Sequence, residues 1–114
     1  MSERDFRLYL VDIIEAGTAI QGYVTGLSLE DFSCDRKTCS AVIREFEIIG
    51  EAVGKLPDRI TRQRPDIEWQ DIKDFRNLLV HEYFGVDMEI VWQVIQNDLP
   101  PLLEAAKEIV NPEL

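Results

Sequence analysis

Four long runs of the sequence repeat large apolar residues at steps of three or four positions, and this spacing constrains the fold more than any other feature. In the last of these runs Ile95, Leu99 and Leu102 follow these steps. Such steps place apolar side chains along one face of an α-helix, whereas a half-buried strand needs alternation at every second residue. The sequence contains no alternating run and no internal repeat. It therefore predicts an all-α fold.

Residues that cap or interrupt helices mark the boundaries between these runs. Ser28, followed by two acidic residues, and Asp87 are suited to begin helices, because their side-chain oxygens accept hydrogen bonds from free backbone N–H groups. Pro57 ends the third helix, and the pair Pro100-Pro101 predicts a kink or restart at Asp98–Leu99, because proline lacks a backbone N–H. We expect helices over residues 6–24, 28–33, 36–55, 69–84 and 87–110, with a polar connector over residues 57–66.

These helices predict a single domain, residues 1–114, folded as an antiparallel up-and-down bundle of four main helices and one short helix. A chain of 114 residues can bury a core, but it is close to the size at which a partner chain often adds stability. Gly50 costs about 1 kcal/mol relative to alanine inside a helix, so its presence indicates a close helix contact. The core positions expected in the last two main helices are Trp69, Ile72, Phe75, Leu79, Val80, Ile90, Val91, Val94, Ile95, Leu99, Leu102, Leu103, Ala106 and Val110.

Composition argues against several classes of protein. No apolar run approaches the ~18 residues of a membrane span, and the charged start lacks the apolar core of a secretory signal, so we expect a cytoplasmic location. Cys34 and Cys39 lie close together and the single histidine lies far away, which gives too few ligands at the wrong spacing for a zinc site. We expect two reduced thiols and neither a metal ion nor another cofactor.

One stretch near the end of the fourth main helix carries reactive side chains. It places Arg76, His81 and Tyr83 in the pattern Arg-x4-His-x-Tyr, and His81 is the only histidine of the chain. These residues offer a fixed cation, a group that exchanges a proton near neutral pH, and a phenol, although so short a pattern also fits ordinary surface residues. His81 lies about 140° around a continuous helix from Arg76, so one unbroken helix cannot bring all three together. We expect Gly85 to end the helix in the left-handed conformation, and either fraying or a second copy of the chain to complete the site.

This stretch resembles the ribonuclease motif of the HEPN superfamily, and its surroundings resemble the HepT-like toxin branch. In that branch a tryptophan-containing helix leads into Arg-Asn-x-x-x-His-x-Tyr, which Trp69, Arg76-Asn77 and His81-Glu82-Tyr83 match. Further similarities lie in the third helix at residues 46–52 and in the last helix at residues 86–87, 91–92 and 99–100. The resemblance covers most of the chain and is weakest over residues 1–35.

The resemblance implies a homodimeric, metal-independent endoribonuclease that is the toxin of a type II toxin-antitoxin pair. Arg76 would hold the phosphate, and His81 would act as general acid or base when the 2'-hydroxyl of RNA attacks. One histidine fills only one of the two proton-transfer roles, so two protomers would share the cleft. The resemblance also implies that a partner nucleotidyltransferase antitoxin inactivates the chain by attaching AMP to Tyr83. Asn77 and Glu51 would support the site, Glu51 by orienting Arg76.

The charge distribution leaves the manner of RNA contact open. The net charge is −10, whereas surfaces that bind phosphate are usually basic. Residues 55–76 contain six basic and five acidic side chains, a net +1 that leaves −11 for the remainder, so the motif can still lie in a positive field. Arg59, Arg62 and Arg64 fit either a solvated face or a rim that faces phosphate, and Lys73 is a further candidate for RNA contact.

Two other interpretations remain beside the nuclease. The acidic composition also suits a non-catalytic helical dimer that serves as the binding partner of a nucleotidyltransferase. A plain helical dimerisation domain without an enzyme partner is the third.

Overall fold

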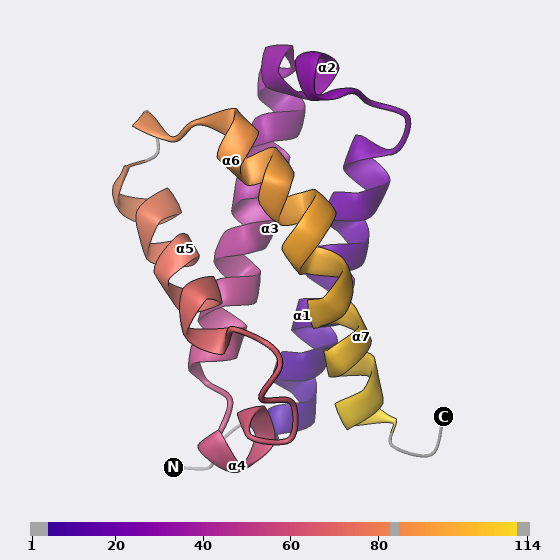
Figure 1. Cartoon of the computed structure of the whole chain (residues 1–114), viewed down its shortest axis with the longest axis vertical. Helices are drawn as coiled ribbons and strands as arrows, with labels where there is room; N and C mark the ends of the chain where they lie inside the picture. Colours follow the sequence, from indigo (N-terminus) through magenta and orange to yellow (C-terminus); the bar gives the residue numbers. More distant parts are fainter. Residues whose placement is uncertain (1–4, 83–84, 112–114) are drawn as a thin grey trace.

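The computed structural model describes residues 5–82 and 85–111, and all regular secondary structure within these ranges is helical. Its elements are α1 (Phe6–Val24), α2 (Leu29–Cys34), α3 (Arg36–Gly54), α4 (Asp58–Thr61), α5 (Trp69–His81), α6 (Met88–Gln93), the π-helical segment η2 (Val94–Asp98) and α7 (Leu99–Val110). Figure 1 shows α1, α3, α5 and α7 running along the long axis in alternating directions. The predicted all-α bundle is confirmed, and the connector holds one further helical turn, α4. No helix in the described part of the chain is long and apolar enough to cross a bilayer.

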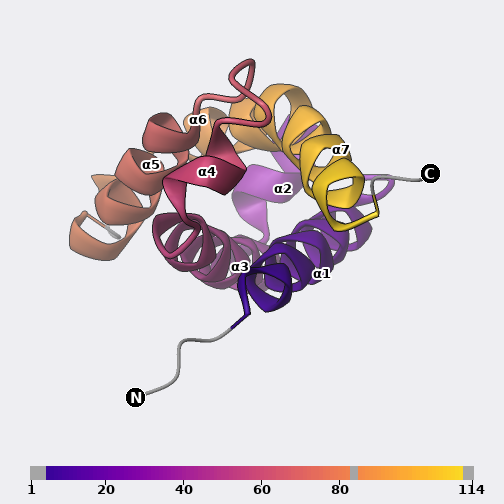
Figure 2. The same ribbon diagram turned by 90° about the horizontal axis from the view of Figure 1, so that it is seen from below.

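The four long helices do not support one another equally. Helix α1 packs against α3 and α7, and α5 packs against the opposite side of α3. Figure 2, which looks along the bundle, shows α5 and α7 apart from each other. Within α5 Leu79 is the only buried residue, whereas α3 contributes eight buried residues. Helix α5 is therefore held chiefly by a single neighbour.

Side-chain caps fix the starts of α1, α2, α3 and α6. Ser28 accepts a hydrogen bond from the backbone N–H of Asp31, and Asp31 accepts one from the N–H of Ser28, which forms a capping box at α2. Asp35 accepts bonds from the backbone and the hydroxyl of Thr38 at the start of α3. Asp87 accepts from the N–H of residue 89 at 2.9 Å. The caps predicted at Ser28 and Asp87 are confirmed.

The core is formed chiefly by α1, α3 and α7. Its largest fully enclosed side chains are Phe32, Leu10, Ile13, Ile20, Ile49, Ile60, Leu79, Leu99, Val42 and Val91. Burial of a side chain of this size contributes about 1.5–3 kcal/mol. Val80 and Ile90, which the sequence pattern places inside, are instead 39% and 49% exposed. Both predictions were wrong for the same reason: α5 and the short α6 are covered on only part of their surfaces.

The last helix is interrupted where the sequence predicts it. The segment η2 precedes α7, and the backbone N–H of Leu99 donates to the carbonyl of Val94, a π-type bond across five residues. Pro100 and Pro101 occupy the first turn of α7, where backbone N–H groups have no acceptor within the helix, so the missing N–H of proline breaks no hydrogen bond of α7. The break at Asp98–Leu99 is therefore confirmed, and it takes the form of a widened turn rather than a gap.

The end of α5 differs from the expectation. The helix ends at His81, not at Phe84, and the N–H of Glu82 closes it by donating to the carbonyl of Leu78 at 2.9 Å. Gly85 does not adopt the left-handed conformation, and among the described residues Gly26 is the glycine with positive φ, at 79°. Because the helix closes at residue 82, Gly85 lies too far along the chain to act as its stop. Tyr83 and Phe84 lie outside the described residues.

Candidate functional site

Arg76 lies directly against Gly50, at the contact between α3 and α5. A Cβ atom placed on Gly50 would lie 2.2 Å from Cβ and 2.6 Å from Cγ of Arg76, which is shorter than atoms can approach. The stem of Arg76 therefore occupies the volume that any other residue at position 50 would need. The sequence indicates a close helix contact at Gly50, but it does not reveal that Arg76 is the residue in contact.

The guanidinium group of Arg76 is only partly satisfied. Its NH1 donates to Oδ1 of Asn77 at 3.2 Å, while its Nε is buried and has no hydrogen-bond partner among the described residues. No carboxylate of the described chain forms an ion pair with it. A buried donor without an acceptor costs about 1–3 kcal/mol. Packing on Gly50 rather than a counter-ion thus holds this cation, and its charge stays available to an anion.

His81 occupies the last turn of α5 and is exposed. The helix runs unbroken from Trp69 to His81, so the five positions between Arg76 and His81 correspond to about 140° around its axis. The helix is thus regular between Arg76 and His81, and the fraying expected at its end, around His81 and Tyr83, falls partly outside the described residues. Within one protomer α5 presents the cation towards α3 and the imidazole on a different face.

The two expected supporting residues lie in different positions relative to Arg76. Asn77 accepts the hydrogen bond described above, so its amide faces the guanidinium. The carboxylate of Glu51 is exposed and lies 3.8 Å from Nζ of Lys55 on the next turn of α3. The expected contact of Glu51 with Arg76 is absent from the structure.

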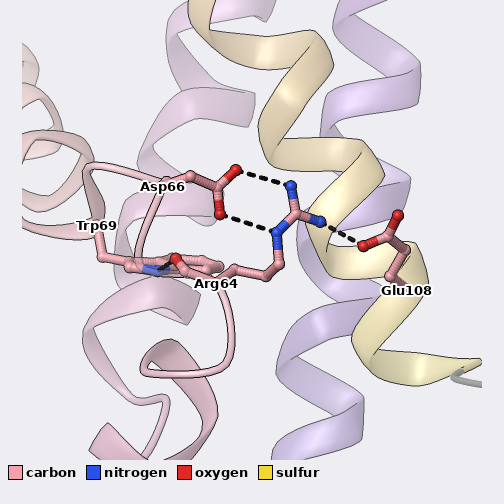
Figure 3. Close-up of polar contacts among 4 residues, drawn as sticks. All are labelled: Arg64, Asp66, Trp69 and Glu108. Atoms are coloured by element: carbon pink, nitrogen blue, oxygen red, sulfur yellow. Dashed lines mark hydrogen bonds and ion pairs between the residues drawn. The ribbon is translucent and has the colours of Figure 1, made fainter.

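Arg64, a candidate for RNA contact, instead links the connector to the end of α7 (Figure 3). Its Nε and NH2 donate to the two carboxylate oxygens of Asp66 at 2.9 and 2.8 Å, and its NH1 donates to Glu108. Its carbonyl oxygen accepts a bond from the indole N–H of Trp69 at 3.0 Å. The guanidinium holds the pKa of the Asp66 carboxyl below its usual value through these hydrogen bonds. With its donors occupied in this way, Arg64 has a structural role.

The other basic candidates are spread along the bundle. Arg59 lies over the ring of Phe6, 5.1 Å from its centroid, and Arg62 is exposed beside α4. Figure 1 shows α4 at the opposite end of the bundle from the last turn of α5, so these two arginines lie far from His81. Lys73 lies one turn before Arg76 on α5, and its stem passes Gly54 of α3. Of the four candidates, Lys73 alone shares the α3–α5 contact with Arg76.

The cysteines take no part in this arrangement. Both are free thiols, as expected; Cys34 is exposed, and Cys39 is buried and donates to the carbonyl of Phe32. Burial raises the pKa of the Cys39 thiol. Among the described residues there is no group of three or more histidine, cysteine, aspartate or glutamate side chains arranged to hold a metal ion.

Comparison with known proteins gives a consistent result. The family model described as "Ribonuclease HepT-like" matches residues 13–109. A protein of Thermococcus cleftensis named "Probable ribonuclease HepT" is 42% identical over 100 residues, which cover 88% of this chain and 91% of that protein. A candidate RNase of Methanocaldococcus jannaschii is 36% identical over 97% of this chain and 92% of its own length, and one of Caldanaerobacter subterraneus is 38% identical over 94% and 96%. No solved structure matches the chain. The family model and these relatives span most of the chain, and the chain therefore belongs to the HepT-like ribonuclease family.

Proposed function

We propose that this protein is an endoribonuclease that cuts RNA without a metal ion and acts as the toxin of a toxin-antitoxin pair. The observation that carries the proposal is the position of Arg76, which packs on Gly50, has no counter-ion among the described residues and shares helix α5 with His81. In the reaction the 2'-hydroxyl attacks the adjacent phosphorus, and the bond to the 5'-oxygen of the next nucleotide breaks. The products are a 2',3'-cyclic phosphate and a free 5'-hydroxyl.

Each residue has one task in this reaction. Arg76 binds the non-bridging phosphate oxygens and stabilises the charge that develops on them. His81 removes the proton of the 2'-hydroxyl or delivers a proton to the leaving 5'-oxygen. Asn77 holds the guanidinium through the observed hydrogen bond. Lys73, one turn away, adds positive charge beside the same phosphate.

A dimer supplies the second proton-transfer group that one protomer lacks. The chain has a single histidine, and α5 keeps it on a different face from Arg76. In a two-fold dimer, two copies of Arg76 and His81 line one cleft, so that one imidazole is the base and the other the acid. The exposure of Leu78, 37%, supports this arrangement because this apolar residue lies three positions before His81 on α5, about 60° from it around the helix axis.

Tyr83 is the proposed point of control. A partner nucleotidyltransferase antitoxin transfers AMP from ATP to the phenol oxygen and releases pyrophosphate. The added phosphodiester brings negative charge and bulk next to His81, where it competes with the RNA phosphate for Arg76. RNA and ATP are both found in the cytoplasm, and we propose that the protein acts there.

Cleavage of a short RNA by the purified protein tests the nuclease. The His81→Ala and Arg76→Ala variants should each lose at least about 100-fold in rate, as expected for removal of a general acid–base or an electrostatic stabiliser. If the folded protein cuts no RNA at all, this result would contradict the proposed nuclease function. It would favour the second candidate function, that of a non-catalytic dimer that binds a nucleotidyltransferase. The net charge of −10 is the observation that favours this second function.

A further inference from the structure

An apolar groove opens between α5 and the η2–α7 segment, where the bundle is not closed. Its cavity measures about 340 Å³. Phe46 and Ile49 of α3 form its floor, Ile72 and Phe75 of α5 form one wall, and residues of η2 and α7 form the other. The rings of Phe46 and Phe75 meet edge to face, with centroids 5.2 Å apart, which joins the floor of the groove to its α5 wall. The groove is preformed in this chain.

All polar residues that line this groove are acidic. They are Asp66, Glu68, Asp71 and Asp98. Asp66 is neutralised by Arg64, but the side chains of Glu68, Asp71 and Asp98 form no hydrogen bond or ion pair within the described ranges. Glu68 and Asp98 precede α5 and α7 without capping them. Three unpaired carboxylates therefore surround an apolar cavity, on both of its walls.

We infer that this groove binds an amphipathic, basic segment of a partner protein, with apolar side chains in the cavity and lysine or arginine on the acidic rim. A cavity of this size admits a few large apolar side chains, while the backbone that carries them stays on the rim. The carboxylates on the two walls are placed to meet cations on either side of such a segment. Neither Arg76 nor His81 lines the groove, so the inference does not depend on the proposed nuclease.

The charge of the groove favours a basic peptide segment over two other possible occupants, RNA and a second copy of this chain. RNA is excluded because its phosphates would approach unpaired carboxylates without a compensating cation. In a second copy the same groove carries the same acidic rim, so pairing of two copies groove to groove is repulsive. A basic apolar segment satisfies both the cavity and its rim.

Binding of a fluorescent synthetic helical peptide to the full chain tests the inference. The peptide carries leucines at steps of three and four on one face and lysine and arginine on the flanks. A scrambled peptide of the same composition keeps the charge but loses the apolar face. We expect fluorescence polarisation to show binding of the first peptide at least about tenfold tighter than that of the second, and weaker binding at high salt.

Two triple variants locate the binding site. Glu68→Gln/Asp71→Asn/Asp98→Asn removes the unpaired rim charges, and Glu15→Gln/Glu30→Gln/Glu89→Gln removes three exposed charges elsewhere. The first should weaken binding about tenfold and the second less than about twofold, because screened surface charges act over short distances. No binding to the native chain, equal binding of the scrambled peptide, or equal weakening by both triples would overturn the inference.

Discussion

The side chain of Arg76 occupies the space that a side chain at Gly50 would need: a Cβ atom at position 50 would lie 2.2 Å from Cβ of Arg76. The contact joins a packing residue of α3 to the proposed phosphate-binding residue of α5. It explains why a glycine is found in the middle of a helix that it weakens by about 1 kcal/mol. The geometry of the site thus depends on a residue that takes no part in the chemistry.

The first prediction concerns this contact. Gly50→Ala should push Arg76 and α5 away from α3, costing about 1–3 kcal/mol in the free energy of unfolding. It should lower the rate of RNA cleavage at least about tenfold, since a displacement near 1 Å can cost about 100-fold. Urea unfolding and cleavage kinetics measure the two effects separately.

Two other helical glycines provide controls for Gly50. A Cβ at Gly17 would lie 2.4 Å from Cδ2 of Leu103, so Gly17→Ala disturbs packing far from Arg76. A Cβ at Gly54 would lie 3.6 Å from Cδ of Lys73, an ordinary contact, and Gly54→Ala should be neutral or stabilising by up to about 1 kcal/mol. If Gly50→Ala loses stability as Gly17→Ala does but cleaves at the native rate, Gly50 does not position Arg76.

The second prediction concerns the nucleophile. Because the 2'-hydroxyl attacks and the proton transfers are assigned to His81, an RNA with a 2'-O-methyl group at the cleaved nucleotide should remain intact. Cleavage of the unmodified RNA should continue in EDTA and yield a 2',3'-cyclic phosphate, which mass spectrometry of the fragments detects. Cleavage of the methylated RNA, or a complete loss of activity in EDTA, would contradict this mechanism.

The third prediction concerns the dimer. Leu78→Glu would place a charge in the proposed interface beside His81, so we expect the dissociation constant of the dimer to rise at least about tenfold and cleavage to fall with it. Sedimentation at several concentrations measures the association. Leu8→Glu, at a residue of α1 that is 46% exposed, is the matched control and should leave both unchanged. A dimer that survives Leu78→Glu would place the interface elsewhere.

The fourth prediction concerns the pH dependence of stability. Hydrogen bonds from Arg64 lower the pKa of Asp66 below its usual 3.8 in the folded state. The ion pair therefore stabilises the fold above the unfolded pKa, and this contribution disappears as the pH falls through the lower, folded pKa. The native chain should exceed Asp66→Asn in thermal midpoint at pH 7, and the difference should shrink towards pH 2. Glu15→Gln, which removes an exposed carboxyl of α1, should show no comparable change in the difference.

Helix boundaries could be predicted from the sequence because their causes are local. The cap at Ser28 depends on a residue three positions away, and the break before Pro100 depends on a missing backbone N–H. The end of α5 was predicted three residues too late, because Gly85 was assigned a left-handed conformation that the chain does not adopt. Local patterns allow several stops, and closure by the N–H of Glu82 selects one.

Contacts between distant parts of the chain, within the site and outside it, could not be predicted from local patterns. Arg64 pairs with Glu108, which follows it by 44 positions, and periodicity gives no information about that contact. The exposure of Val80 follows from which helices cover α5, and that depends on the packing of the whole bundle. The sequence predicts Arg76 and His81 as a motif. That Arg76 packs on Gly50 follows only from how α3 and α5 align in the folded chain.

The support of α5 by a single helix has a consequence for local unfolding. Helix α5 contributes Leu79 alone to the fully buried core, with Trp69, Ile72 and Phe75 packed against its edge, so we expect it to detach at a lower free-energy cost than α1, α3 or α7. Its amide protons should then exchange with deuterium before those of the other long helices. Arg76 and His81 belong to this segment, so repositioning the residues assigned to RNA cleavage should cost less free energy than separating α1, α3 and α7.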